Sequence, residues 1–172
     1  MTDEIFDIVD DSDSVVGSAS REEVHRLGLL HRSTHLIVFD SRGRVLLQRR
    51  SAEKDTFPGR WDSSVSGHVD SGEMYDQCVL REAKEEIGID LFETPERIFK
   101  IDACEETANE FTWVYRTLND GPFSVNQQEI SEIRWFTKED VGRLIDSKRE
   151  IFSPAFALVW SMMQEGGFLE VD

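Results

Sequence analysis

Three glutamates lie close together in the stretch between residues 67 and 89. Glu82, Glu85 and Glu86 are spaced by three and four residues, so on a helix they share one face. Like charges at these spacings destabilise a helix by about 0.2–0.5 kcal/mol per pair. Hard divalent cations such as Mg²⁺ bind carboxylate oxygens and share their remaining coordination positions with phosphates. A site for Mg²⁺ and a diphosphate would therefore explain the cluster.

An ordinary solvated acidic face is the alternative interpretation of the same residues. Such a face usually alternates Lys or Arg with the acids, because opposite charges relieve the repulsion. Arg81 and Lys84 are present, but we expect both to project away from the middle of the acidic sector. Composition by itself favours the solvated face, whereas the chemistry of hard cations favours the metal site.

The elements around the glutamates predict a mixed α/β domain. Apolar residues at spacings of three and four predict a helix over residues 74–87 that ends at Gly88. Thr137 and the Ser153-Pro154 pair are typical of helix starts, and the final helix is expected to have Gly166 beyond its end. Apolar runs between turn residues predict strands at 5–9, 15–16, 34–39, 44–49, 111–116 and 133–136, the first two forming an N-terminal hairpin within about residues 1–20.

Composition and charge exclude several classes of protein. The 172 residues contain no repeat or linker, which predicts a single domain over residues 1–172. A formal net charge of −16 argues against unassisted binding of nucleic acid or of an anionic membrane. No apolar run approaches the ~18 residues of a membrane span, and the acidic N-terminus is unlike a secretory signal. Two cysteines without metal-type spacing favour a reducing, cytoplasmic environment, and the choice between monomer and homodimer stays open.

Residues 67–89 resemble the Nudix box at every fixed position. Those positions are Gly67, Glu73, Arg81-Glu82, Ala83, Glu85-Glu86, Gly88 and Ile89. The resemblance implies a Nudix α/β/α sandwich with a mixed central sheet, which hydrolyses a nucleoside diphosphate linked to another group. It also implies that Glu82, Glu85 and Glu86 bind Mg²⁺ or Mn²⁺. The carbonyl of Gly67 is a common additional ligand in this family, and Glu73 is expected to pair with Arg81.

The general base of the reaction varies within the family. It can be a glutamate of the box or one from a distant loop, so the candidates are Glu85, Glu110 and Glu129. For Glu110 and Glu129, the alternative is an ordinary surface carboxylate.

The sequence from about residue 5 to residue 155 resembles a Nudix subgroup related to isopentenyl-diphosphate isomerase. This resemblance implies that Arg50 and Lys54 contact the substrate diphosphate, the alternative being a basic hairpin edge that prevents strand pairing. It also implies a second metal site. Its candidate ligands are His25, His31, His68 and Glu110, although a single histidine is more often a surface or hydrogen-bonded residue.

Two departures from that subgroup disfavour isomerase activity. Ser66 stands where the isomerase has its catalytic cysteine, and Ala108 where it has a further acidic ligand. Proton addition to a carbon–carbon double bond needs a well-placed acid, and a serine hydroxyl is a far weaker acid than a thiol. We therefore predict a metal-dependent hydrolase of small-molecule diphosphates. The alternatives are an isomerase-like enzyme and a catalytically silent nucleotide-binding module.

Overall fold

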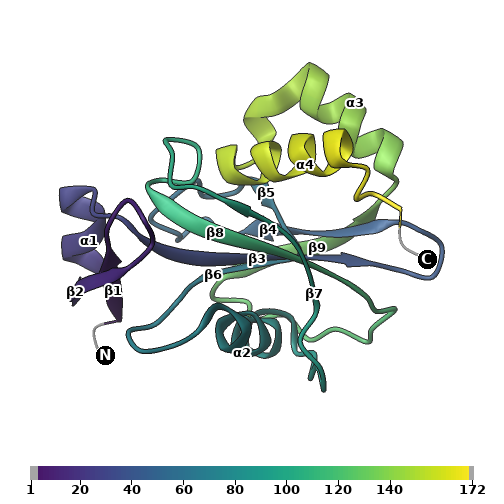
Figure 1. Ribbon diagram of the computed structural model, residues 1–172. Helices are drawn as coiled ribbons and strands as arrows, with labels where there is room; N and C mark the ends of the chain where they lie inside the picture. The colour runs from purple at the N-terminus through teal and green to yellow at the C-terminus, as the bar shows by residue number, and fades with distance from the viewer. Residues whose placement is uncertain (1–3, 171–172) are drawn as a thin grey trace.

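A mixed β-sheet forms the centre of the computed structural model, which describes residues 4–170 (Figure 1). Its main path runs in the order β5–β4–β3–β8–β7, while β6 pairs with β3 and β9 pairs with β4. Strands β3 and β8 are parallel and the other pairs are antiparallel, which confirms the predicted mixed sheet. The strands are β3 (His31–Phe39), β4 (Val45–Arg50), β5 (Trp61–Asp62), β6 (Val65–His68), β7 (Glu96–Ile101), β8 (Glu110–Leu118) and β9 (Ile130–Phe136).

Helices cover both faces of this sheet, as Figure 1 shows. Helix α2 (Tyr75–Ile87) lies on one face, and α3 (Lys138–Lys148) and α4 (Pro154–Gly166) lie on the other, with the short 3₁₀ helix η1 (Arg149–Ile151) between them. Successive side chains of a strand point to opposite faces. Leu36 of β3 accordingly packs in the core beneath α2, and Ile37 packs in the core beneath α3 and α4. The predicted α/β/α sandwich is confirmed.

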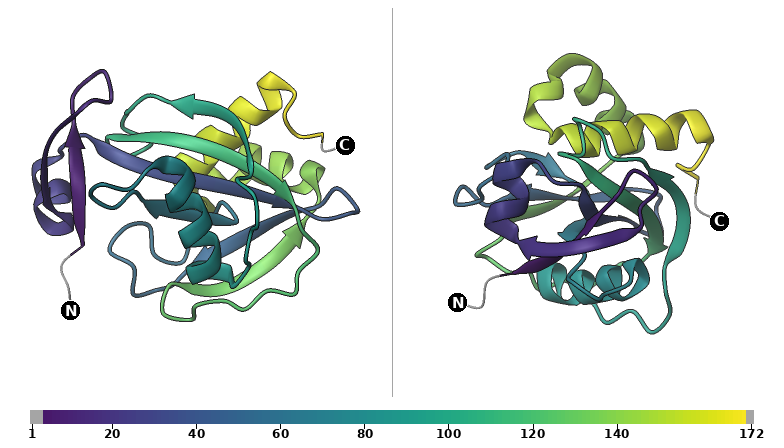
Figure 2. Two further views of the ribbon diagram at one scale, coloured as in Figure 1. Left: turned by 60° about the horizontal axis from the view of Figure 1, so that its bottom comes forward. Right: turned by 60° about the vertical axis from the view of Figure 1, so that its left-hand side comes forward.

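The N-terminal hairpin lies at one end of the sheet, where Figures 1 and 2 place it beside a short helix. It consists of β1 (Ile5–Val9) and β2 (Val15–Ser20), and α1 (Arg21–Leu27) follows directly. Asp13 in the hairpin turn accepts hydrogen bonds from Arg32 Nε at 2.6 Å and from the Tyr75 hydroxyl at 2.9 Å. The hairpin is therefore fastened to both β3 and α2. The predicted hairpin is confirmed, and its second strand is longer than the sequence indicates.

The helix ends follow the predicted capping residues closely. Gly88 has a φ of 72° and ends α2 in the left-handed conformation that glycine adopts without strain. Thr137 and Ser153 accept capping hydrogen bonds from the third residue that follows each. The last helix ends one residue later than predicted, because Gly166 is still helical and Gly167 takes the left-handed position. Within residues 4–170, no helix is both long and apolar enough to span a bilayer.

Candidate active site

A cavity of about 460 Å³ lies where α2, the N-terminal hairpin and the loop before β8 meet. Its wall contains most of the residues that the sequence singles out. These are His25, Arg50, Lys54, Gly67, His68, Arg81, Glu82, Glu85, Glu110 and Glu129. Helix α2 contributes Arg81, Glu82 and Glu85 to this wall, and the other elements contribute further acidic, cationic and histidine side chains.

Two of the three box glutamates are buried. Glu82 is 9% exposed and Glu86 is 2% exposed, whereas Glu85 is exposed at the rim of the cavity. The carboxylate of Glu86 lies against the sheet, where its Oε2 accepts hydrogen bonds from Gln48 Nε2 at 2.8 Å and from the Ser66 amide at 3.0 Å. The helix thus places one carboxylate at the cavity wall and a second one just beneath it.

Burial makes negative charge unfavourable at this pair. It raises the pKa of Glu82 to about 7, although the guanidinium of Arg81 opposes the shift. Burial, together with repulsion by Glu82, also raises the pKa of Glu86 well above its usual value. Glu129 adds further repulsion to both. A divalent cation among these oxygens would relieve the repulsion, so the donor set fits a hard cation such as Mg²⁺.

The guanidinium of Arg81 lies among the carboxylates, so the prediction that it projects away from them is wrong. It donates hydrogen bonds to Glu82 Oε1 at 2.7 Å and to Glu85 Oε2 at 3.1 Å. It also makes the expected pair with Glu73, with Nε donating to Oε1 and Nη2 donating to Oε2, both at 2.9 Å. Helical side chains lean toward the helix N-terminus, which carries Arg81 toward Glu73 and brings Glu85, one turn later, back toward Arg81. Lys84 does turn away, and pairs with Asp90 at the surface.

Gly67 permits the close approach of Glu82 to strand β6. A Cβ atom at position 67 would lie 2.1 Å from the carboxyl carbon of Glu82, which is far closer than non-bonded atoms can approach. Any side chain here would therefore displace the glutamate from the cavity wall. The family resemblance also implies that the Gly67 carbonyl binds a cation, and this role stays a prediction.

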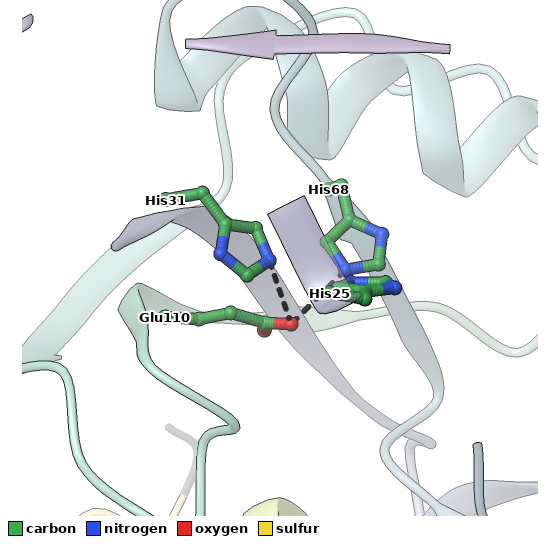
Figure 3. A group of neighbouring side chains, drawn as sticks. All are labelled: His25, His31, His68 and Glu110. Carbon is green, nitrogen blue, oxygen red and sulfur yellow. Dashed lines mark hydrogen bonds and ion pairs between the residues drawn. The ribbon is translucent and has the colours of Figure 1, made fainter. Parts of the chain in front are cut away.

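The three histidines and Glu110 gather in a second cluster, which Figure 3 shows. Strand register explains the gathering, because His31 of β3 stands opposite Glu110 of β8, and β6 brings His68 beside them. His25 approaches from the last turn of α1. One possible ligand atom from each of the four residues lies within 4.8 Å of the others.

Hydrogen bonds orient the rings of this cluster toward Glu110. His31 Nδ1 is 2.9 Å from the carbonyl of Leu29 and donates to it, so its Nε2 faces Glu110. That Nε2 is buried without a hydrogen-bond partner and lies 3.4 Å from Glu110 Oε1. Burial, with the neighbouring His68, lowers the pKa of His25 to about 4. Burial opposes ionisation of Glu110, but His68 and His31 nevertheless hold its pKa well below the usual range.

The two predicted phosphate-binding residues are both engaged with protein groups. Arg50 donates to the carbonyl of Thr56 at 3.0 Å and to Asp62 Oδ2 at 3.3 Å. Lys54 Nζ donates to Glu129 Oε2 at 2.8 Å. Of the three candidates for general base, only Glu129 is thus held by a lysine. Glu85 is held by Arg81, and Glu110 belongs to the histidine cluster.

Sequence reasoning missed Gln48, a residue that fixes one of the box glutamates by a hydrogen bond. Gln48 lies fully buried on β4, where it donates to Glu86, and its polar side chain stands in the otherwise apolar run VLLQ. An uncharged polar residue at a buried strand position needs a hydrogen-bond partner, so Gln48 in this run indicates a buried polar contact. What the sequence could not supply was the identity of the partner.

The fold and the acidic helix together define a Nudix enzyme. The family model described as the NUDIX domain matches residues 29–156, and the chain belongs to this family. It is 36% identical over 146 residues to an uncharacterized Nudix hydrolase of Yersinia pestis, an alignment that covers 83% of this chain and 78% of that one. The Nudix hydrolase YfcD of Escherichia coli K12 is 35% identical, with 83% and 79% covered. The protein is therefore a hydrolase that acts on diphosphates.

Solved structures show the same architecture. The crystal structure of DR0079 from Deinococcus radiodurans superposes with a TM-score of 0.83 at 28% identity, covering 92% of this chain and 98% of that one. The NUDIX domain of Shewanella oneidensis NrtR, solved with ADP ribose, has a TM-score of 0.62 at 19% identity, covering 78% and 86%. At that identity the second likeness concerns the fold alone.

Proposed function

We propose that the protein hydrolyses a small-molecule diphosphate with a divalent cation, Mg²⁺ or Mn²⁺, held by Glu82, Glu85 and Glu86. The observation that carries the proposal is the adjacent burial of Glu82 and Glu86 on the box helix, at and beneath the wall of one cavity. Arg81 pairs with Glu82, but among residues 4–170 no cationic side chain pairs with Glu86, and a buried unpaired carboxylate is costly. The same oxygens make a good site for a hard cation. When bound, such a cation neutralises charge on the diphosphate and lowers the pKa of a coordinated water.

We assign a distinct role in hydrolysis to each of several side chains. Arg81 holds Glu82 and Glu85 in place while it is itself held by Glu73. We assign the general base to Glu129, because it lines the cavity and is close enough to raise the pKa of both buried box glutamates. Glu110 suits that part less well, since a depressed pKa makes a carboxylate a weak base. Arg50 is proposed to contact the diphosphate, because its guanidinium lines the same cavity.

The test of this proposal is turnover of a substrate panel with and without a chelator. The panel contains nucleoside diphosphates linked to a second group, nucleoside triphosphates, and isopentenyl diphosphate as a diphosphate without a base. Release of a monophosphate or of inorganic phosphate that stops with chelator and returns with Mg²⁺ supports the proposal. Absence of release from every member, with or without Mg²⁺, would contradict it.

We further propose that His25, His31, His68 and Glu110 bind a second metal ion. Three imidazoles with one carboxylate suit first-row transition ions better than Mg²⁺, and among residues 4–170 the buried Nε2 of His31 has no hydrogen-bond partner. Protein loaded with Mn²⁺ or Zn²⁺ and then desalted is expected to lose one ion equivalent on His31→Asn. The matched control is His35→Asn, since His35 is equally buried but bonds Ser63 instead of the cluster. Equal metal contents in the two variants would exclude the site.

The same cluster is the observation that favours the second candidate, an isomerase of prenyl diphosphates. Ser66 lines the cavity at the position where the isomerase-like reaction needs an acid, and its side chain is a hydroxyl. We therefore place hydrolysis first. Formation of dimethylallyl diphosphate from isopentenyl diphosphate in the panel above would reverse that order.

A further inference from the structure

The geometry points to Lys54 as a positioning residue that holds the carboxylate of Glu129 at the cavity wall, instead of the phosphate-binding residue that the family resemblance implies. Its ammonium nitrogen lies 2.8 Å from Glu129 Oε2, and the two side chains are 19% and 33% exposed. The inference rests on the proposed function, because it gives Lys54 its effect through the proposed base.

Glu129 is fixed at both of its carboxylate oxygens. Lys54 donates to Oε2, and Asn126 Nδ2 donates to Oε1 at 3.3 Å. The main chain is fixed too, since the Ser51 amide donates to the carbonyl of Glu129 at 2.8 Å. Ser51 and Lys54 belong to one loop. This loop therefore binds both the backbone and the side chain of Glu129.

The loop that carries Glu129 is in turn fastened to the metal-site helix. The amide of Asn126 donates to the carbonyl of Glu86 at 2.9 Å, and the amide of Ser124 donates to the carbonyl of Ile87 at the same distance. The base and the box glutamates thus belong to one hydrogen-bonded unit. Within this unit, the direction of the Glu129 carboxylate depends on Lys54 and Asn126.

Lys54 also balances an electrostatic force on Glu129. Glu129 lines the same cavity as Glu82, and its loop is bonded to the backbone of Glu86, so the negative charges of these acids repel one another. Among residues 4–170, Lys54 is the one cationic side chain that forms an ion pair with Glu129. Without that pair, repulsion would drive the Glu129 carboxylate out of the cavity toward solvent. The direction of the Lys54 ammonium is thus set by Glu129.

A double-mutant cycle separates the two roles of Lys54. We would measure kcat and KM for the best substrate of the panel in wild type, Lys54→Met, Glu129→Gln and the double variant. A residue that acts through Glu129 lowers kcat by about 10–100-fold with KM unchanged, as outer-shell partners do. In the Glu129→Gln background, the same Lys54→Met change should then cost nothing further. Lys54→Arg should recover most of kcat, because it restores a cation of similar reach.

Several outcomes would overturn the inference. A rise in KM of equal size in both backgrounds would make Lys54 a substrate contact. Full activity of Glu129→Gln would remove the residue through which Lys54 acts while leaving the hydrolase proposal intact. A wild type that turns over no diphosphate would instead remove the proposed function, and this inference with it.

The matched control is Lys84→Met, which breaks a lysine–carboxylate pair of the same 2.8 Å length outside the cavity and should leave kcat unchanged. Lys54→Gln repeats the test if the Met variant melts at a lower temperature than wild type.

Discussion

Replacing Glu86 by Gln is expected to lower diphosphate hydrolysis by about 10³-fold, since a catalytic cation supplies several kcal/mol of charge stabilisation and each 1.4 kcal/mol is a factor of ten. Gln is nearly isosteric, and its amide oxygen can still accept from Gln48 and from the Ser66 amide. The loss would therefore reflect the missing charge and not a collapsed wall. The measurement is kcat/KM with saturating Mg²⁺, and the matched control is Glu139→Gln on an exposed position of α3. Equal rates for wild type and Glu86→Gln would remove Glu86 from the metal site.

The same variant should be at least as stable as wild type when no divalent cation is present. The folded-state pKa of Glu86 is raised, so above the unfolded-state pKa of about 4.5 the unfolded chain binds fewer protons than the folded one. Stability of the wild type therefore falls as pH rises above that value, and Gln avoids this cost. Thermal unfolding in chelator at about pH 8 gives the comparison. A clear loss of stability in Glu86→Gln would mean that the carboxylate serves the fold.

Glu129→Gln is expected to lower kcat by about 10²–10⁴-fold, the usual contribution of a general base. Because Gln cannot accept a proton at neutral pH, the chemical step should suffer while binding of the cation by the box glutamates persists. Mn²⁺ titration of the variant checks the second half of this statement. Glu85→Gln is the informative comparison, since Glu85 lines the same cavity and is the candidate base on the box helix. Full activity in Glu129→Gln would remove Glu129 as the base, and a loss in Glu85→Gln with Mn²⁺ binding retained would then transfer the base to the helix.

The box helix could be predicted from sequence because its signals are local. Apolar residues at spacings of three and four define its buried side, and Gly88 marks its end. The same spacing places Glu82, Glu85 and Glu86 on one face. The direction of the Arg81 side chain was mispredicted. A helical wheel draws every side chain perpendicular to the helix axis, whereas this guanidinium extends along the axis to Glu73.

The second cluster could not be derived from spacing at all. His31 and Glu110 are far apart in the chain and meet only because β3 and β8 pair in parallel, with these two residues in register. In the sequence they were linked by family resemblance alone. Local pattern also failed for α1, β6 and β7, which have seven, four and six residues. Val24 is the one buried residue of α1, and Val65 is the one apolar residue of β6, so neither segment shows apolar residues at a regular spacing.

The most direct test of the account is calorimetric titration of Mn²⁺ into chelator-treated wild type and into a Glu82→Gln/Glu86→Gln variant. The wild type should bind one equivalent more than the variant, because the box glutamates hold that ion. The extra binding should weaken from about pH 8 to about pH 5.5, since the raised pKa of Glu82, about 7, lets protons compete for the site. Equal stoichiometry in the two proteins at both pH values would contradict the claim that the box glutamates form a metal site.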